Sequence, residues 1–283
     1  MSGPNETTID ALAYLDQVEK RADLAFTGGD GQRIAWRCWG QGRPVVLLHG
    51  ASGSWRHWIR QVDALKGRRL IVADLPGYGQ SDTPAEPLDV EAMTSAVCDG
   101  IDDLVGAGGG YDLVAFSYGG SVAAHILRRH KGRHGQVFLC APAGFGTPAM
   151  PPTCKVRGLK GAALHAAHRQ NLGSIMIAEP DRIDALAVAI QDVNTRLSRL
   201  RPTGVSRNAR LAEALADSDA QITVVWGARD AFLTGGGVTS RAEMVLKHRP
   251  DARVHIIPDA GHWIAYEADE AVNALMANTL SDG

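Results

Sequence analysis

Residues 114–121 read VAFSYGGS, and this stretch decides the fold. Before it, the apolar run YDLVAF at 111–116 is typical of a buried strand, and after it SVAAHILRRH is typical of a helix. Ser117 would therefore lie on the turn between them. Small residues two positions to either side, Ala115 and Gly119, let strand and helix approach closely. This spacing predicts a nucleophile elbow, with Ala115 where glycine is usual.

Apolar runs that end in turn signals recur along the chain, and most of them are separated by helical patterns such as 91–105 and 267–280. Their near-continuous apolar character predicts strands that are buried on both faces. Alternating strands and helices predict an α/β fold with a doubly wound, mainly parallel sheet. The predicted strands, besides 111–116, are 33–39, 44–50, 69–77, 136–144, 221–227 and 252–258.

One interval, residues 148–215, contains no convincing strand. Within it, Ile183, Leu186 and Ile190 follow helical spacing. The interval follows a proline-rich segment and ends before the penultimate strand, which predicts a helical cap inserted into one domain. We therefore expect residues 1–147 and 216–283 to form the core and residues 148–215 to form the cap.

Composition excludes several classes of protein. The 283 residues are 45% hydrophobic and 21% charged, and 31 acidic residues against 29 basic ones create no global field for nucleic acid or a membrane surface. No apolar run reaches the roughly 20 residues that span a bilayer, and the N-terminus lacks a signal-peptide pattern, so we expect a cytoplasmic protein. The four cysteines are widely spaced and form no CxxC pair, which favours free buried thiols over a disulfide or a metal site.

A serine hydroxyl needs a base, and the base needs an acid to orient it. In a parallel sheet both belong on loops at the carboxyl ends of strands. Asp230 follows the run 221–227, and His262 follows the last strand. Asp259 is a rival acid, but its closeness to His262 in sequence makes an approach from the side opposite Ser117 difficult. The order Ser117, Asp230, His262 predicts an acyl-transfer triad.

An oxyanion formed at Ser117 needs two fixed donors. The elbow offers the backbone N–H of Tyr118, and the loop HGASGSW at 49–55 offers a second, for which Ala51 is preferred and Ser52 is the alternative. We interpret His49 as a residue that supports this loop rather than one that transfers protons. The mechanism calls for no metal and no cofactor.

HGASGSW, DLPGYGQSD, AFSYGGS, WGARD and GHW together resemble the α/β-hydrolase superfamily, from about residue 25 to the C-terminus. Serine at the elbow argues against the dehalogenase and epoxide hydrolase branches, which carry Asp there. The GHW ending and the cap resemble the meta-cleavage-product hydrolases, which cut C–C bonds, and their esterase relatives. Trp263 matches the Trp that follows the catalytic His in that group. Phe116 stands where that group usually has Asn, and this difference favours an ester.

The resemblance thus implies a hydrolase of a small molecule, with an ester favoured, a ring-fission product as the alternative, and a ligand receptor that retains the triad as a further possibility. The sequence leaves the oligomeric state open. The interval 148–215 carries ten Lys or Arg against five Asp or Glu, so it either attracts an anionic substrate or presents solvated helix faces. Arg169 is the candidate cation, and the neighbouring apolar stretch that includes Met176 is a candidate pocket lining. Ser52, Phe116 and Trp263 complete the predicted substrate contacts.

Overall fold

The computed structural model describes residues 7–85, 90–146, 148–200 and 210–280. Its centre is an eight-stranded sheet with the order β1-β2-β4-β3-β5-β6-β7-β8, in which β2 runs antiparallel to its neighbours and the others are parallel. The predicted α/β class and mainly parallel sheet are confirmed, and β1 is an added edge strand. The strands are β1 (Asp23–Thr27), β2 (Ile34–Trp39), β3 (Pro44–Leu48), β4 (Arg69–Asp74), β5 (Tyr111–Phe116), β6 (His134–Cys140), β7 (Gln221–Gly227) and β8 (Arg253–Ile257).

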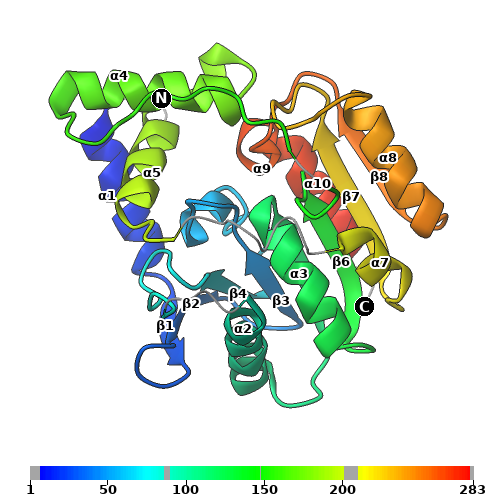
Figure 1. Ribbon diagram of the computed structural model, residues 1–283. Coiled ribbons are helices and arrows are strands. Elements are labelled where there is room, and N and C mark those ends of the chain that lie inside the picture. The colour runs from blue at the N-terminus through cyan, green and yellow to red at the C-terminus, as the bar shows by residue number, and fades with distance from the viewer. Residues whose placement is uncertain (1–6, 86–89, 147, 201–209, 281–283) are drawn as a thin grey trace.

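Helices flank the sheet on both faces, with α2 and α3 in front of it and α10 behind it in Figure 1. The helices of the core are α2 (Val90–Val105), α3 (Tyr118–Arg129), α7 (Leu211–Ala216), α8 (Gly237–His248), α9 (Ile264–Glu267) and α10 (Asp269–Leu280), with a 3-10 turn η1 (Trp55–Trp58) after β3. This three-layer arrangement buries both faces of the central strands. Every residue of β5 is buried, as its unbroken apolar run predicts.

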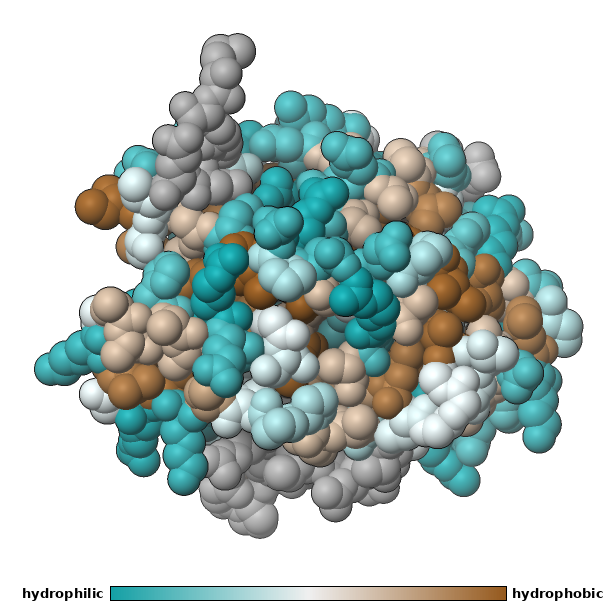
Figure 2. Space-filling model, turned by 90° about the horizontal axis from the view of Figure 1, so that it is seen from above, coloured by the Kyte–Doolittle hydropathy of each residue, from teal (hydrophilic) through white to brown (hydrophobic). Residues whose placement is uncertain are grey.

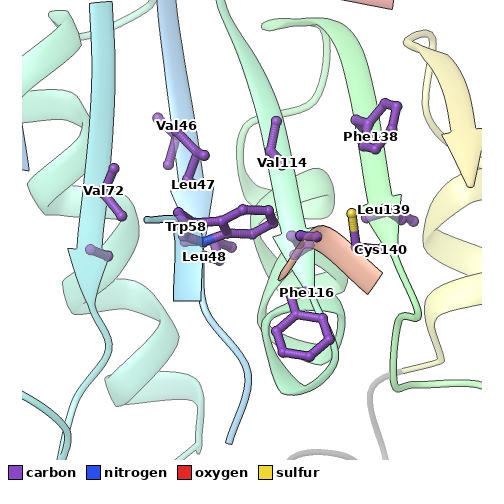
Figure 3. Packing of buried hydrophobic residues seen from close by; sticks show 14 of the residues in the cluster. Val46, Leu47, Leu48, Trp58, Val72, Val114, Phe116, Phe138, Leu139 and Cys140 are labelled. Carbon is purple, nitrogen blue, oxygen red and sulfur yellow. The ribbon is translucent and has the colours of Figure 1, made fainter. Parts of the chain in front are cut away.

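Strand register brings two loops together. Leu48 at the end of β3 pairs with Ala115 near the end of β5, so the loops that follow these strands leave the sheet side by side. Figure 3 shows buried side chains of the neighbouring strands β4, β3, β5 and β6, with Trp58 of η1 lying across them and the ring of Phe116 at the end of β5. The turn that carries Ser117 and the loop after β3 therefore both follow strands whose side chains are buried and closely packed.

A helical layer lies beyond the carboxyl ends of the strands. It comprises α4 (Gly161–Ile175), η2 (Pro180–Arg182) and α5 (Ala185–Arg196), and the N-terminal helix α1 (Thr8–Glu19) runs alongside α5 (Figure 1). At the other end of the predicted interval, α7 packs on α3 and α8. The division into core and cap remains an interpretation, in which α1 adjoins the cap and α7 adjoins the core.

Helix α1 is fixed to the sheet by an ion network. Arg37 on β2 is fully buried and donates to Glu19 at the end of α1 and to Asp74 at the end of β4, with N···O distances of 2.6 Å in each case. Asp74 also accepts from the backbone N–H of Trp55.

Within the described part of the chain, no helix is both long and apolar enough to cross a membrane. All four cysteines are free thiols, three of them buried and Cys154 half-buried.

Candidate active site

Ser117 occupies a strained turn between β5 and α3. Its φ of 50° and ψ of −117° lie in a region that residues other than glycine rarely adopt, and such strain is a frequent feature of functional sites. Gly119 makes the turn possible, because a methyl group added there would lie 2.6 Å from the carbonyl oxygen of Leu48. The backbone N–H of Ser117 donates to Cys140 on β6 at 3.1 Å. The elbow is thus clamped between the two neighbouring strands.

A chain of hydrogen bonds runs from Ser117 through His262 to Asp230. His262 Nε2 lies 2.8 Å from Ser117 Oγ, and His262 Nδ1 lies 2.7 Å from Asp230 Oδ2. His262 and Asp230 are each 7% exposed, so water competes little for these bonds. The three predicted residues therefore meet with the geometry that transfers a proton from serine to imidazole.

The acid is held in one orientation. The second oxygen of Asp230 accepts the backbone N–H of Phe232 at 2.8 Å, which leaves Oδ2 for the imidazole. The ring of Phe232 lies against that of His262, with centroids 4.5 Å apart. Asp259, the rival acid, is exposed to solvent, and the imidazole is bonded to Asp230.

The loop after β3 faces the elbow. Gly50 approaches the elbow closely, because an added methyl group there would lie 3.1 Å from Cβ of Ser117. Ala51 and Ser52 follow, and Ser52 has a φ of 49°. Tyr118 is the first residue of α3, where backbone N–H groups have no carbonyl partner within the helix. The donors predicted at Tyr118 and Ala51 thus come from two adjoining turns, and their role as an oxyanion hole stays a prediction.

His49 supports this loop. Its ring is fully buried, with Nδ1 2.7 Å from the carbonyl oxygen of Gly50 and Nε2 accepting the backbone N–H of Leu75 at 2.8 Å. Burial lowers the pKa of His49, so the ring is held neutral. Both nitrogens are bonded to the backbone, in agreement with the structural role expected from the sequence.

His57 is a residue that the sequence analysis did not single out. Its fully buried ring lies beneath the loop after β3, where Nδ1 accepts the N–H of Gly50 at 3.3 Å and a methyl group at Gly53 would meet the ring at 2.3 Å. Burial lowers its pKa well below the ordinary value, with smaller contributions from His49 and His262. The signal in the sequence was a histidine in a short turn bounded by two tryptophans, WRHW at 55–58.

The structure places two of the predicted substrate contacts in packed surroundings. Phe116 is 1% exposed, and its ring lies 5.1 Å from that of His262 and 5.3 Å from that of His57, measured between centroids. Trp263 is fully buried, stacks on Tyr266 and donates its indole N–H to the carbonyl of His57 at 3.0 Å. Phe116 thus packs against the imidazole of His262, and Trp263 packs against His57 and Tyr266; their contact with a substrate stays a prediction.

Arg169 is not brought to the elbow. Its guanidinium donates to the backbone carbonyls of Ile183 and of Pro180, the latter at 3.2 Å, and so fastens η2 to α4. It lines a surface hollow together with residues of α1 and α5. The carbonyl of Pro180 also accepts the backbone N–H of Ile183 at 3.2 Å, so Arg169 adds a second donor at the η2 turn.

Met176 and Ser52 do adjoin the site. Met176 follows α4 and is buried, and its carbonyl accepts the backbone N–H of Trp263 at 2.7 Å. Ser52 is exposed, and its hydroxyl lies 3.4 Å from that of Ser198, which follows α5. Cap segments therefore reach both the loop after β3 and the loop that carries His262.

Some of the cations in the predicted cap interval are bonded to other parts of the structure. Arg199 donates to the backbone of Gly79 and Ser81 and to the hydroxyl of Thr83, and Arg196 pairs with Asp192. Seen from above in Figure 2, hydrophilic side chains are numerous in the middle of this face, where apolar atoms lie between them, and larger apolar groups lie toward either side. For Arg196 and Arg199, these contacts favour a structural role over the attraction of an anionic substrate.

Comparisons with known proteins agree with this architecture. A model of the alpha/beta hydrolase family matches residues 45–275. The dihydrolipoyllysine-residue acetyltransferase component of the acetoin cleaving system of Pseudomonas putida is 29% identical over 83% of this chain, which spans only 62% of that protein. The 2-hydroxy-6-oxo-6-phenylhexa-2,4-dienoate hydrolase of Burkholderia cepacia is 25% identical over 86% of this chain and 90% of its own length.

Among solved structures, carboxylesterase CesB from Bacillus subtilis is similar with a TM-score of 0.73 at 18% identity, covering 98% of this chain and 99% of that one. This likeness concerns the fold. The chain belongs to the alpha/beta hydrolase family, since the family model covers most of its length. It is an enzyme of the hydrolase class, and the curated proteins that it resembles include a dienoate hydrolase.

Proposed function

We propose that this hydrolase cleaves a small carboxylic ester through an acyl-enzyme on Ser117. The observation that carries the proposal is the hydrogen-bonded chain from Ser117 through His262 to Asp230, built on a strained elbow. A serine whose hydroxyl is bonded to a buried, oriented imidazole is an activated nucleophile. The same arrangement without a strained turn would be a weaker indication, because buried polar chains also serve structure.

In the proposed reaction, His262 Nε2 takes the hydroxyl proton while Ser117 Oγ attacks the ester carbonyl carbon. The N–H groups of Tyr118 and Ala51 would stabilise the resulting oxyanion, and Asp230 would stabilise the imidazolium. The protonated imidazole then gives its proton to the alkoxy oxygen, and the alcohol leaves. Water, deprotonated by His262, then attacks the acyl carbon, and the protonated imidazole returns this proton to Ser117 Oγ as the C–Oγ bond breaks and the carboxylic acid leaves.

Hydrolysis of a C–C bond is the second candidate. It is favoured by the 25% identical relative from Burkholderia cepacia, whose name describes a dienoate hydrolase. Such a reaction requires a prior keto–enol proton transfer in the substrate, which benefits from polar groups around the oxyanion side of the pocket. Phe116 supplies none, and the rings of His57, Trp58 and His262 surround it. Because the side chain at position 116 offers no hydrogen-bonding group, the site favours the ester.

Steady-state kinetics on a neutral aryl ester and a ring-fission dienoate would test the proposal. We expect kcat/KM for the ester to exceed that for the dienoate by at least about tenfold, or about 1.4 kcal/mol in transition-state stabilisation. A preferred dienoate would reverse the assignment. A single slow round on both substrates, without steady turnover, would instead indicate a ligand receptor that retains the triad.

A further inference from the structure

A buried carboxylate joins the His262 loop, residues 258–263, to the cap. Glu267 ends α9 and is only 4% exposed. Its Oε2 accepts the backbone N–H of Gly261 at 2.6 Å, and its Oε1 accepts the backbone N–H of Glu179 at 2.7 Å. Gly261 directly precedes His262, whereas Glu179 ends the segment that leads from α4 to η2. One side chain therefore holds two parts of the molecule that lie far apart in sequence.

The segment Met176–Glu179 is called here the return segment of the cap. It has further bonds to the loop that carries His262 and to the loop that carries Asp230. The N–H of Trp263 donates to the carbonyl of Met176 at 2.7 Å. Arg229, the neighbour of Asp230, donates to the carbonyl of Ala178 at 3.2 Å and pairs with the carboxylate of Glu179. The return segment is thus bonded to the loop of the acid and to the loop of the base.

The contact between Gly261 and the return segment is also sterically tight. A methyl group added at Gly261 would lie 2.9 Å from the nitrogen of Ala178 and 3.1 Å from the carbonyl oxygen of Met176. A small shift of the return segment would therefore displace the backbone next to His262. The hydrogen bond between His262 Nε2 and Ser117 Oγ is 2.8 Å long. Such a shift would lengthen it and so slow the transfer of the serine proton, which is the first step of the proposed reaction.

Both bonds to Glu267 require an acceptor. The two neighbouring groups are backbone N–H donors, and an ionised carboxylate satisfies both because each of its oxygens accepts. We propose that Glu267 is a positioning residue that locks the His262 loop against the return segment of the cap and so keeps the imidazole at the Ser117 hydroxyl. This inference rests on the proposed role of His262 as the base.

Tyr266 provides a separate link from the same helix. Its hydroxyl donates to Asp184, the N-cap of α5, at 2.5 Å. Loss of the Glu267 bonds would consequently leave the cap attached to α9 through Tyr266. For this reason we expect the isosteric change Glu267→Gln to alter the placement of His262 without releasing the cap.

The test compares Glu267→Gln with Glu270→Gln, which removes one negative charge from an exposed position at the start of α10. An amide at position 267 can accept from only one neighbour and turns a donor toward the other. The measurement is the second-order rate of Ser117 labelling by a small fluorophosphonate, followed by intact mass well below the melting temperature of each variant. We expect labelling of Glu267→Gln to slow about tenfold, equivalent to about 1.4 kcal/mol in activation free energy, and that of Glu270→Gln to match the wild type.

A folded Glu267→Gln variant that labels as fast as the wild type would overturn the positioning role. If the wild type itself takes up no label at Ser117, the proposed function fails instead, so the two failures are distinguishable. Should Glu267→Gln not fold, hydrogen exchange of the wild-type protein decides. The amides of Gly261 and Glu179 should then be protected to a similar degree, and free exchange at either amide would contradict the lock.

Discussion

Replacing Asp230 by Asn tests the proposed orientation of the base. In the structure, one oxygen of Asp230 accepts the N–H of Phe232 at 2.8 Å and the other accepts from His262 Nδ1 at 2.7 Å. An Asn side chain has a single oxygen, and the bond to Phe232 will hold that oxygen away from the imidazole. The amide NH2 will then face Nδ1, which must become an acceptor, and the ring proton will move to Nε2.

With the proton on Nε2, His262 cannot accept the proton of Ser117. We expect kcat to fall by about 10⁴, or roughly 5.5 kcal/mol in activation free energy, the size of effect that a wrong imidazole tautomer has in serine proteases. The assay is initial-rate hydrolysis of a neutral aryl ester by protein whose circular dichroism matches the wild type. Asp259→Asn is the control, and because Asp259 is exposed we expect a change of no more than about twofold. A loss below about tenfold for Asp230→Asn, or a larger loss for Asp259→Asn, would refute the reasoning.

Three further predictions concern the surroundings of the site. Arg169→Ala should change KM equally for a neutral ester and a carboxylate-bearing half-ester, since the guanidinium is bonded to the carbonyls of Ile183 and Pro180; a selective rise for the half-ester would restore an anion-binding role. Phe116→Asn should lower the free energy of unfolding in urea by roughly 3 kcal/mol or more, because it buries an amide among aromatic rings, and an unchanged midpoint would argue against that packing. Burial lowers the pKa of His134 to about 4, so as the pH falls the unfolded chain binds a proton on this residue before the folded chain does. The free energy of unfolding should therefore fall by up to roughly 3 kcal/mol as the pH drops from about 6.5 toward 4. The variant His134→Gln should show a weaker pH dependence of this free energy.

The sequence alone was enough to predict those site residues that lie on loops directly after a strand. Parallel strands deliver their following loops to one edge of the sheet, so the order Ser117, Asp230, His262 and the loop at Ala51 could be inferred from local patterns. The unbroken apolar runs likewise indicated which strands are buried on both faces. These features follow from short stretches of chain and from general rules of sheet topology.

Features that depend on contacts between distant segments could not be inferred in this way. The roles of Glu267 and His57 emerge only once the cap and the loop after β3 fold over them, because no local pattern distinguishes a buried carboxylate from an exposed one. Arg169 illustrates the opposite case. Its charge suggested a ligand, whereas the carbonyls around η2 are its partners. The position of α1 beside α5 was also unexpected, because it joins two helices that lie far apart in the sequence.

The central claim is that Ser117 carries an acyl group during turnover. The most direct measurement mixes enzyme with an excess of a neutral aryl ester, quenches with acid on the millisecond scale, and locates the added mass by peptide mapping. The account predicts one acyl group on the peptide that contains Ser117, formed in a burst, decaying at kcat once substrate is exhausted, and absent from Ser117→Ala. Steady turnover by the wild type without an acylated Ser117, or acylation of a different residue at the rate of turnover, would contradict it.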